Sequence, residues 1–382
     1  MSTDLPTWSF PGWYAPGRDP RTDAAVAGFD ERNHQLTKPR GSLGLLEAIG
    51  RRLAAIQQVE RPVARPAACL LFASDHPVAA RGVSAYPAAV TRAMVANFAG
   101  GGAAASVLCR HADVPLTVVD VGVAGGPVIA TADGATTYVR DPVADLAVGD
   151  LVDDDAMPQA TYLAALAAGA RAVDAATERG GVRVVIIGEM GIGNSTCAAA
   201  VVAALLGPAA ALADLVGPGT GVAGAALEAK RAVVAAALER VGANEGPLDG
   251  HRAMQALGGR ELAAMMGAMA RAVERRVAVL VDGYIAGAAA LALCTVAPAA
   301  GAGLLFGHRS REPGHRRIFI HLADAADAHA DALWARPLVE LELALGEGSG
   351  ALVALPIVDT ACALHGAMAT FGEAAVPDRE PA

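Results

Sequence analysis

The stretch "IIGEMGIGNSTCAAAVVAALLG" (186–207) decides how the rest of the chain is interpreted. An apolar run leads into closely spaced glycines, then into the small polar residues Asn194 and Ser195, and then into an alanine-rich segment. Gly191 and Gly193 permit a tight turn, and Asn and Ser are favoured where helices start. The stretch therefore predicts a strand, a glycine-rich turn and a helix whose N-terminus can hold an anion.

A purely structural interpretation of this turn stays open, because Asn194 or Ser195 could simply cap the helix. The turn is not a P-loop, since Gly193 is followed by Asn194 rather than by lysine. The glycine spacing is not that of a dinucleotide-binding fingerprint either, and Ser195 does not stand in a GxSxG hydrolase motif. Glu189, at the strand end, favours a functional site. A carboxylate would repel phosphate there, so it should face another part of a ligand, such as ribose hydroxyls.

Several other apolar runs resemble the one before this turn, and most are followed by an alanine-rich segment. They are rich in Val, Ile and Leu, without the alternation of a half-exposed strand. Such runs indicate a parallel sheet covered by helices on both faces, in which ligands bind beyond the carboxyl ends of the strands. The runs are 68–76, 115–122, 182–189, 277–283 and 303–310, and polar residues at their ends are Asp75, His76, Asp120, Glu189, Asp282, His308, Arg309 and Ser310.

Composition limits the possible partners and compartments. The 382 residues are 54% hydrophobic and 18% charged, which excludes a disordered chain. A net charge of −9 and 4% aromatic residues argue against a nucleic-acid partner. The five cysteines form no CxxC pair and the N-terminus shows no secretion signal, so we expect a cytoplasmic protein. The uncharged segment 284–307 contains Pro298, and we interpret it as a buried helix, a turn and a strand rather than a membrane span.

Two further segments carry candidate chemistry. In 343–356, Glu347 stands between two glycines, where it is either an exposed loop acid or a general base beside a planar ligand. The segment 307–317 holds His308 and His315, but their spacing fits no metal motif, so we expect no metal there. Cys197, at the start of the alanine-rich helix, is expected to be a packed small residue.

Segments spread over the chain together resemble the family of nicotinate-nucleotide:5,6-dimethylbenzimidazole phosphoribosyltransferases. The matching segments follow the family's order from about residue 36 to residue 376, and GEMGIGN and LGEGSGA are the most specific of them. They include "LTKPRGSLGLLE" (36–47), "SDHPVAARGVSAYPAAVT" (74–91), "IGEMGIGNSTCAAA" (187–200), "GPGTGVAGAALEAK" (217–230), "VLVDGYIAGAAAL" (279–291), "GHRSREPGH" (307–315) and "LGEGSGALVALP" (345–356).

The resemblance implies that the chain makes α-ribazole 5′-phosphate and nicotinate from nicotinate mononucleotide and 5,6-dimethylbenzimidazole, with inversion at the ribose C1′. Glu347 matches the acid that takes the imidazole proton, and Glu189 matches a second acid beside the ribose. The other implied substrate-binding residues are Gly191, Gly193, Asn194 and Ser195 at the 5′-phosphate, Lys230, Asp282 and Ser310 around the nucleotide, Ser84 and Tyr86 around the base, and in addition Leu345 and Gly346.

The resemblance also implies a fold and an assembly. The fold is α/β, with a Rossmann-like, mostly parallel sheet covered by helices and a small helical domain drawn from both chain ends. The expected divisions are 1–65 (arm and helices), 66–330 (α/β domain) and 331–382 (C-terminal helices with the LGEGSG turn). A homodimer without cofactor or metal, and without a nucleic-acid or membrane partner, is the implied state.

Departures from the family pattern leave alternatives open. Pro77, Arg40 and Ala88 differ from the residues common in the family. The acceptor could therefore be another base, such as adenine or a phenol, or the protein could bind nucleotides without catalysis. We also expect an arm of little regular structure over 1–30 and a peripheral loop insertion over 318–335.

Overall fold

The fold is built on a parallel sheet. The computed structural model describes residues 23–128, 136–325 and 336–377. Its six strands run in the order β3-β2-β1-β4-β5-β6, and every neighbouring pair is parallel. From β1 the chain adds β2 and β3 on one side of the sheet and then β4, β5 and β6 on the other side. The strand order therefore reverses between β1 and β4, and sheets of this kind bind ligands at such a point. The strands are β1 (Ala67–Ser74), β2 (Leu116–Gly122), β3 (Thr136–Arg140), β4 (Val184–Met190), β5 (Ala278–Val281) and β6 (Leu304–Phe306).

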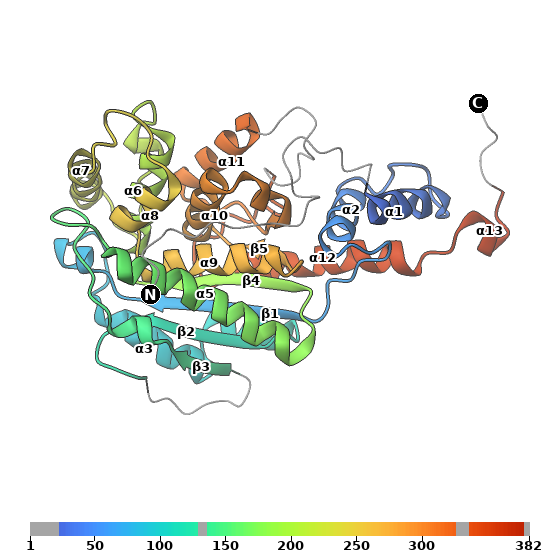
Figure 1. Cartoon of the computed structure of the whole chain (residues 1–382), viewed down its shortest axis with the longest axis horizontal. Coiled ribbons are helices and arrows are strands. Elements are labelled where there is room, and N and C mark those ends of the chain that lie inside the picture. Colours follow the sequence, from blue (N-terminus) through green and yellow to red (C-terminus); the bar gives the residue numbers. More distant parts are fainter. Residues whose placement is uncertain (1–22, 129–135, 326–335, 378–382) are drawn as a thin grey trace.

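Helices cover both faces of the sheet (Figure 1). On one face α5, α6, α8, α9 and α10 share a core with the strands, and on the other α2, α3, α4 and α12 do so. The α-helices are α1 (Ala24–Gln35), α2 (Leu45–Gln57), α3 (Ala89–Ala99), α4 (Ala104–His111), α5 (Gln159–Gly180), α6 (Asn194–Leu206), α7 (Ala225–Arg240), α8 (Gly250–Leu257), α9 (Arg260–Glu274), α10 (Tyr284–Val296), α11 (Pro313–Ala325), α12 (Ser349–Ala367) and α13 (Phe371–Ala374). Short 3-10 helices are η3 (Pro77–Arg81), η4 (Pro142–Asp145), η5 (Leu212–Asp214) and η6 (Pro298–Gly303).

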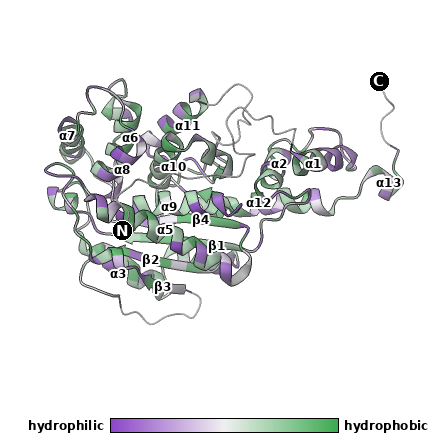
Figure 2. Ribbon diagram, in the orientation of Figure 1, coloured by the Kyte–Doolittle hydropathy of each residue, from purple (hydrophilic) through white to green (hydrophobic). Residues whose placement is uncertain are grey.

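The side chains of β1 show why this strand carries no alternation of apolar and polar residues. Leu70 and Phe72 pack into the core under α5 and α9, whereas Cys69 and Leu71 pack into the opposite core under α12. Successive side chains point to opposite faces, and both faces are covered. Figure 2 shows the central strands coloured mainly as hydrophobic.

The structure confirms the α/β fold and the five expected strands. It also confirms that 284–307 forms a buried helix, a turn and a strand, here α10, η6 and β6. The sequence did not indicate β3, because this edge strand is short and its residues are only half-buried or exposed.

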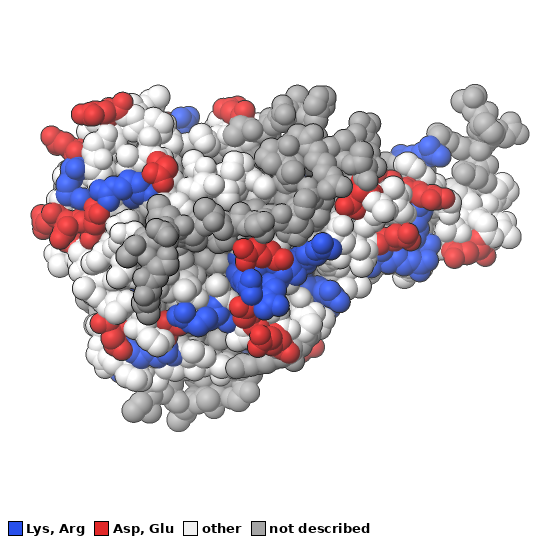
Figure 3. Space-filling model, viewed as in Figure 1, with Lys and Arg blue, Asp and Glu red and all other residues white. Residues whose placement is uncertain are grey.

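On the face drawn in Figure 3, basic residues over α5 and α9 lie among acidic ones. Arg271 and Arg275, for example, both form ion pairs with Asp174.

Two expectations of irregular structure were wrong in part. Residues 24–30 belong to α1, which starts at Ala24 because the Asp23 carboxylate accepts hydrogen bonds from the first N–H groups of the helix. Residues 318–325 belong to α11 rather than to a loop, because Ile318 and Leu322 are buried against the core. Residues 1–22 and 326–335, on which the rest of these expectations fall, lie outside the described residues.

Helix α1, near the start of the described residues, lies beside the end of α12. Arg32 of α1 donates hydrogen bonds to the carbonyl oxygens of His365, Gly366 and Met368 at the end of that helix. Within the described chain, α12 is long and apolar enough to cross a membrane by length and composition alone. It packs instead on the sheet and on α2, as a core helix does (Figure 1).

Candidate active site

The turn between β4 and α6 is the strand, turn and helix expected from the sequence. Gly193 is the N-cap of α6 with φ 98°, a conformation that favours glycine. A Cβ at Gly191 would lie 2.6 Å from the carbonyl oxygen of Ser74, so this position also requires glycine. The turn therefore brings the N-terminus of α6 to the carboxyl edge of the sheet beside β1, where N–H groups favour an anion.

Glu189, near the end of β4, is buried next to this turn. Its Oε2 accepts a hydrogen bond from Nδ2 of Asn194, at 2.5 Å. Burial, reinforced by the nearby charge of Asp282, raises the pKa of the Glu189 carboxyl to about 8. The carboxyl is therefore mostly protonated at neutral pH, and its proton is available to a hydrogen-bond acceptor.

The LGEGSG turn lies directly against Glu189. Gly346, Glu347 and Gly348 have φ values of 83°, 64° and 78°, all in the left-handed region. A Cβ at Gly346 would lie 2.2 Å from Oε1 of Glu189, and a Cβ at Gly188 would lie 2.6 Å from the backbone N of Gly348. The two turns therefore approach closely because both have glycine at the contact.

Glu347 is the one residue of this turn that carries a conformational cost, because a side chain is disfavoured at positive φ. Its carboxylate is buried, and Oε2 accepts a hydrogen bond from the backbone N–H of Ala105 in α4, at 3.1 Å. Burial raises the pKa of Glu347, although the Ala105 hydrogen bond opposes this shift. A buried carboxyl with a raised pKa suits a general base.

Asp282, just beyond β5, fixes the start of α12. Its Oδ1 accepts from the N–H groups of Gly350 and Ala351, at 2.8 and 3.0 Å, and its Oδ2 accepts from that of Gly348, at 3.1 Å. Burial raises the pKa of Asp282. Its oxygens thus accept backbone N–H groups from the N-cap residue Gly348 and from the first turn of α12, which indicates that Asp282 positions the turn.

Lys230 of α7 reaches the start of α6. Its Nζ donates to Oγ of Ser195, at 2.9 Å, and to the carbonyl oxygen of Gly217, at 3.1 Å. Burial lowers the pKa of Lys230, while Glu312 opposes that shift. A cation, a hydroxyl group and a helix N-terminus therefore meet at one place, a combination suited to phosphate.

Glu312 was not identified from the sequence. It is buried, and its Oε1 accepts from the backbone N–H of Gly219, at 3.0 Å. Its neighbour Ser310 is also buried, with Oγ accepting from the N–H of Glu312 at 3.3 Å and its own N–H donating to Nδ1 of His315 at 2.9 Å. In the sequence, only the position of Glu312 between Arg311 and Pro313 in the REPGH segment could have indicated it as a candidate.

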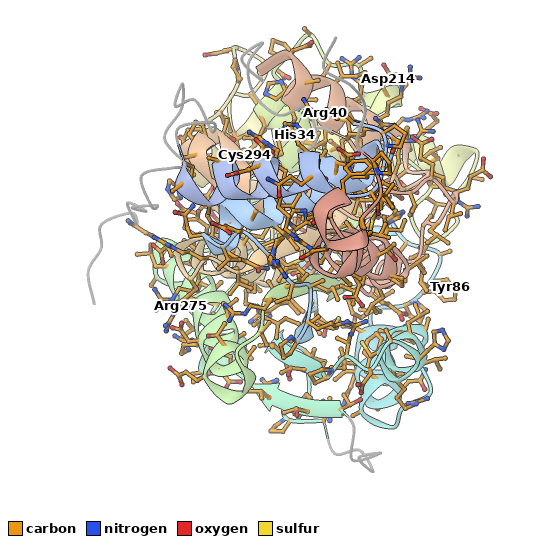
Figure 4. All side chains as sticks on the ribbon, turned by 90° about the vertical axis from the view of Figure 1, so that its right-hand side faces the viewer. His34, Arg40, Tyr86, Asp214, Arg275 and Cys294 are labelled. Atoms are coloured by element: carbon orange, nitrogen blue, oxygen red, sulfur yellow. The ribbon has the colours of Figure 1, made fainter. Side chains whose placement is uncertain are left out.

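Ser84 and Tyr86, expected around the base, and Leu345, expected to bind substrate, lie in different surroundings. Oγ of Ser84 lies 2.9 Å from Oγ1 of Thr220, so its loop is bound to the loop that precedes α7. Tyr86 and Leu345 are 55% and 57% exposed. Figure 4 shows Tyr86 at the edge of the molecule, pointing away from the ribbon.

The structure therefore unites most of the expected residues in one continuous site. Gly346 and Glu347 lie against Glu189, whose partner Asn194 starts α6 beside Ser195 and Lys230. Burial lowers the pKa of His315 to about 3, so its imidazole is neutral, and its Nδ1 accepts a hydrogen bond from the N–H of Ser310. Among residues 23–128, 136–325 and 336–377, no group of three or more His, Cys, Asp or Glu could hold a metal ion.

The chain is similar to known proteins over most of its length. A family model described as phosphoribosyltransferase matches residues 19–376. A protein of Bradyrhizobium sp. strain BTAi1, named nicotinate-nucleotide–dimethylbenzimidazole phosphoribosyltransferase, is 45% identical over 376 residues, which cover 98% of this chain and 99% of that protein. A Pseudomonas putida KT2440 protein of the same name is 42% identical and covers 96% of this chain and 98% of its own length. The crystal structure of CobT from Thermus thermophilus is similar with a TM-score of 0.80 and 38% identity, covering 92% of this chain and 99% of that one.

Proposed function

Because this chain belongs to the phosphoribosyltransferase family that its relatives represent, we propose that it transfers the 5-phosphoribosyl group of nicotinate mononucleotide to 5,6-dimethylbenzimidazole. The products are α-ribazole 5′-phosphate and nicotinate. A ring nitrogen of the base bonds to C1′ of the ribose while the bond from C1′ to nicotinate breaks on the opposite face. This one displacement inverts the configuration at C1′ from β to α.

Glu347 is the general base of the proposed reaction. The attacking base carries an imidazole proton that must leave as its other nitrogen bonds to C1′. The Glu347 carboxylate takes this proton, which makes the attacking nitrogen more nucleophilic. Its burial supports the role, since a buried carboxylate gains from protonation. Its hydrogen bond from Ala105 fixes where the second oxygen points.

Glu189 binds the ribose in this proposal. With a pKa of about 8 the carboxyl carries a proton at neutral pH, so it adds no negative charge near the phosphate. It can donate a hydrogen bond to a ribose hydroxyl while Oε2 still accepts from Asn194. A protonated Glu189 does not repel the phosphate, so both can lie at the same turn.

Lys230, Ser195 and the N-terminus of α6 bind the 5′-phosphate. The existing bond from Lys230 to Ser195 shows that both polar groups already face one another. Phosphate would replace Ser195 as the main partner of the ammonium group and gain a charge-assisted hydrogen bond. Fixing the phosphate and ribose places C1′ against the base, and such positioning is a large part of catalysis.

The observation that carries this proposal is the close contact between the two glycine-rich turns. A Cβ at Gly346 would collide with Oε1 of Glu189, so the ribose-binding acid and the base at Glu347 belong to one site. The two segments are the most specific ones in the resemblance to the family. A protein that only bound nucleotides would have no use for the strained Glu347.

We also propose a cytoplasmic homodimer. Tyr86, expected at the base, and Leu345, expected to bind substrate, expose large apolar side chains in the single chain. A second chain that covered them would remove both side chains from water and complete a pocket for an apolar ring. Light scattering during size-exclusion chromatography gives the mass that decides between monomer and dimer.

Incubation with nicotinate mononucleotide and 5,6-dimethylbenzimidazole, followed by chromatography, tests the reaction. Nicotinate and an α-riboside phosphate should appear in equal amounts, and neither should appear with Glu347→Ala. Product with adenine or a phenol, but not with dimethylbenzimidazole, would show that the chain transfers the phosphoribosyl group to a different acceptor base. Nucleotide binding without turnover on any of these bases would overturn the enzymatic proposal.

A further inference from the structure

A small pocket separate from the proposed substrate site lies beyond the carboxyl end of β1. Its cavity volume is ≈ 10 Å³, about the space that one water-sized molecule needs, and it is partly open to solvent. None of the residues assigned above to substrate lines it. Its wall includes Asp75, His76, Cys197, Gly259 and Arg260. The proposed transfer reaction gives this pocket no role.

A buried chain of three side chains runs along this pocket. Sγ of Cys197 lies 3.3 Å from Nδ1 of His76, and Nε2 of His76 lies 2.7 Å from Oε1 of Glu261. All three residues are at least nine-tenths buried. They come from α6, from the residue before η3 and from α9, so the fold brings them together.

The imidazole of His76 is closely fitted between two glycines. A Cβ at Gly191 would lie 3.0 Å from Nε2, and a Cβ at Gly259 would lie 2.3 Å from Cε1. The ring therefore cannot turn easily. Since Nε2 faces the Glu261 carboxylate, it carries the proton, and Nδ1 presents its lone pair to the thiol of Cys197.

This arrangement is that of a nucleophile, a base and an acid that orients the base. Burial opposes a charged imidazole, yet the charges of Glu261 and Cys197 raise the pKa of His76 well above its ordinary value. His76 can therefore hold the thiol proton. The three groups do not suit a metal, because Cys197 and Glu261 lie on opposite nitrogens of the ring rather than around one point.

We propose that Cys197 is a reactive thiol, activated by His76 and Glu261, that is oxidised by hydrogen peroxide or a similarly small hydroperoxide entering through this pocket. His76 takes the thiol proton, and the sulfur attacks one peroxide oxygen. The S–O bond forms as the O–O bond breaks, and the proton returns from His76 to the leaving hydroxide as water. Sulfur loses two electrons, the peroxide gains them, and the product is the sulfenic acid of Cys197.

The pocket limits which oxidant can reach Cys197, and it determines which cysteine of the chain reacts first. Its small volume admits a peroxide more readily than a bulky oxidant. The chain's other cysteines, Cys69, Cys109, Cys294 and Cys362, are free and buried, and none of them lines this pocket. We therefore expect Cys197 to react first.

Peroxide treatment with dimedone, which traps sulfenic acids, tests the proposal. Peptide mass mapping of the unaltered protein should place the first adduct on Cys197, and Cys197→Ser should lack it. His76→Gln keeps a donor for Glu261 but has no acceptor nitrogen facing the thiol, so the adduct should form at least about tenfold more slowly. Glu261→Gln leaves His76 in place but weakens its orientation, and should give a smaller decrease.

Two results would overturn the proposal. The first is an adduct on the unaltered protein that forms no faster at Cys197 than at Cys69 or Cys109, a result that does not depend on any variant folding. The second is an unchanged rate in a His76→Gln protein that melts at the temperature of the parent.

Oxidation should also reach the neighbouring site, a consequence that rests on the proposed function. Cys197 and Ser195 share the start of α6, and His76 lies against Gly191. An oxygen added to the sulfur needs space between α6 and His76, so transfer activity should fall with adduct formation, but not in Cys197→Ser. Equal loss in both proteins would contradict this coupling. If the transfer itself were absent, the adduct would still test the thiol.

Discussion

Oε2 of Glu347 accepts a hydrogen bond from the backbone N–H of Ala105, at 3.1 Å, and so joins the turn before α12 to the first turn of α4. The bond uses one carboxylate oxygen and leaves the other for a substrate proton. It also fixes the side chain at a residue whose backbone is already strained, with φ 64°. The proposed base is therefore held in place by structure on both sides of the site.

Replacing Glu347 with glutamine should remove the base and keep the hydrogen bond. The amide oxygen can still accept from Ala105, so the melting temperature should hardly change. We expect kcat to fall by about 10²–10⁴-fold, the usual contribution of a general base, with little change in KM for the mononucleotide. Steady-state kinetics with both substrates measures this.

The matched control is Glu342→Gln. Glu342 precedes the same turn and also has a positive φ, of 55°, but its side chain is exposed. The activity of this variant should equal that of the parent. An equal loss of activity in the two variants, or full activity in Glu347→Gln, would show that Glu347 is not the general base of the reaction.

The pH dependence of the transfer should reflect the burial of Glu347. Only its deprotonated form is a base, and burial raises its pKa above the ordinary value of 4.5. The value of kcat/KM should therefore decline as the pH falls, with a midpoint above 4.5. A pH–rate profile measures the midpoint, and a midpoint at or below the ordinary value would contradict the role of this residue.

Stability should depend on pH through Glu189. Its carboxyl has a pKa of about 8 in the folded chain and an ordinary value of 4.5. Between these values the folded state binds more protons than the unfolded state, so this group makes the protein less stable as the pH rises. Glu189→Gln should therefore gain stability relative to the parent from about pH 5 to about pH 9. Thermal melting of both proteins at several pH values measures this. A difference in melting temperature that does not change with pH would show that Glu189 has the ordinary pKa of an exposed acid.

Local patterns in the sequence were sufficient for most of the sheet and for the turn at α6. Strands buried on both faces give continuous apolar runs, and Asn194 lies close enough to Glu189 in the chain to be recognised with it. The edge strand β3 could not be recognised, because its half-exposed residues resemble a loop. The pairing of Lys230 with Ser195 joins residues 35 positions apart, and only the packing of α7 determines it.

Glu312 shows why the rest of the site needed the structure. Among arginines in the REPGH segment it resembles a surface charge, yet it is buried because the loop before α7 presents the N–H of Gly219 to it. Asp282 was expected at a strand end and lies there. Its use as the acceptor for the start of α12 depends on a contact between residues 66 to 69 positions apart, which no local pattern reveals.

Asp282→Asn should reduce both stability and activity. Both oxygens of Asp282 accept backbone N–H groups, so an amide NH₂ must face a donor, at a cost of about 1–3 kcal/mol. The turn that carries Glu347 loses its support, and kcat should fall. Asp249→Asn is the control, because Oδ1 of Asp249 accepts both cap bonds of α8 and asparagine serves well there. Melting and kinetics of both variants decide the matter, and similar behaviour of the two would refute the positioning role.

Gly188→Ala should separate the two glycine-rich turns. The added Cβ would lie 2.6 Å from the backbone N of Gly348, and neither backbone can yield without moving Glu347. We expect a loss of about 1–3 kcal/mol from overpacking, and a decrease in kcat of up to about 10²-fold from the displaced base. Gly366→Ala is the matched control, because nothing lies within 4 Å of its Cβ position in α12, and alanine there should stabilise by about 0.4–1 kcal/mol. A Gly188→Ala protein with the kcat of the parent would show that the reaction does not require the contact between the turns.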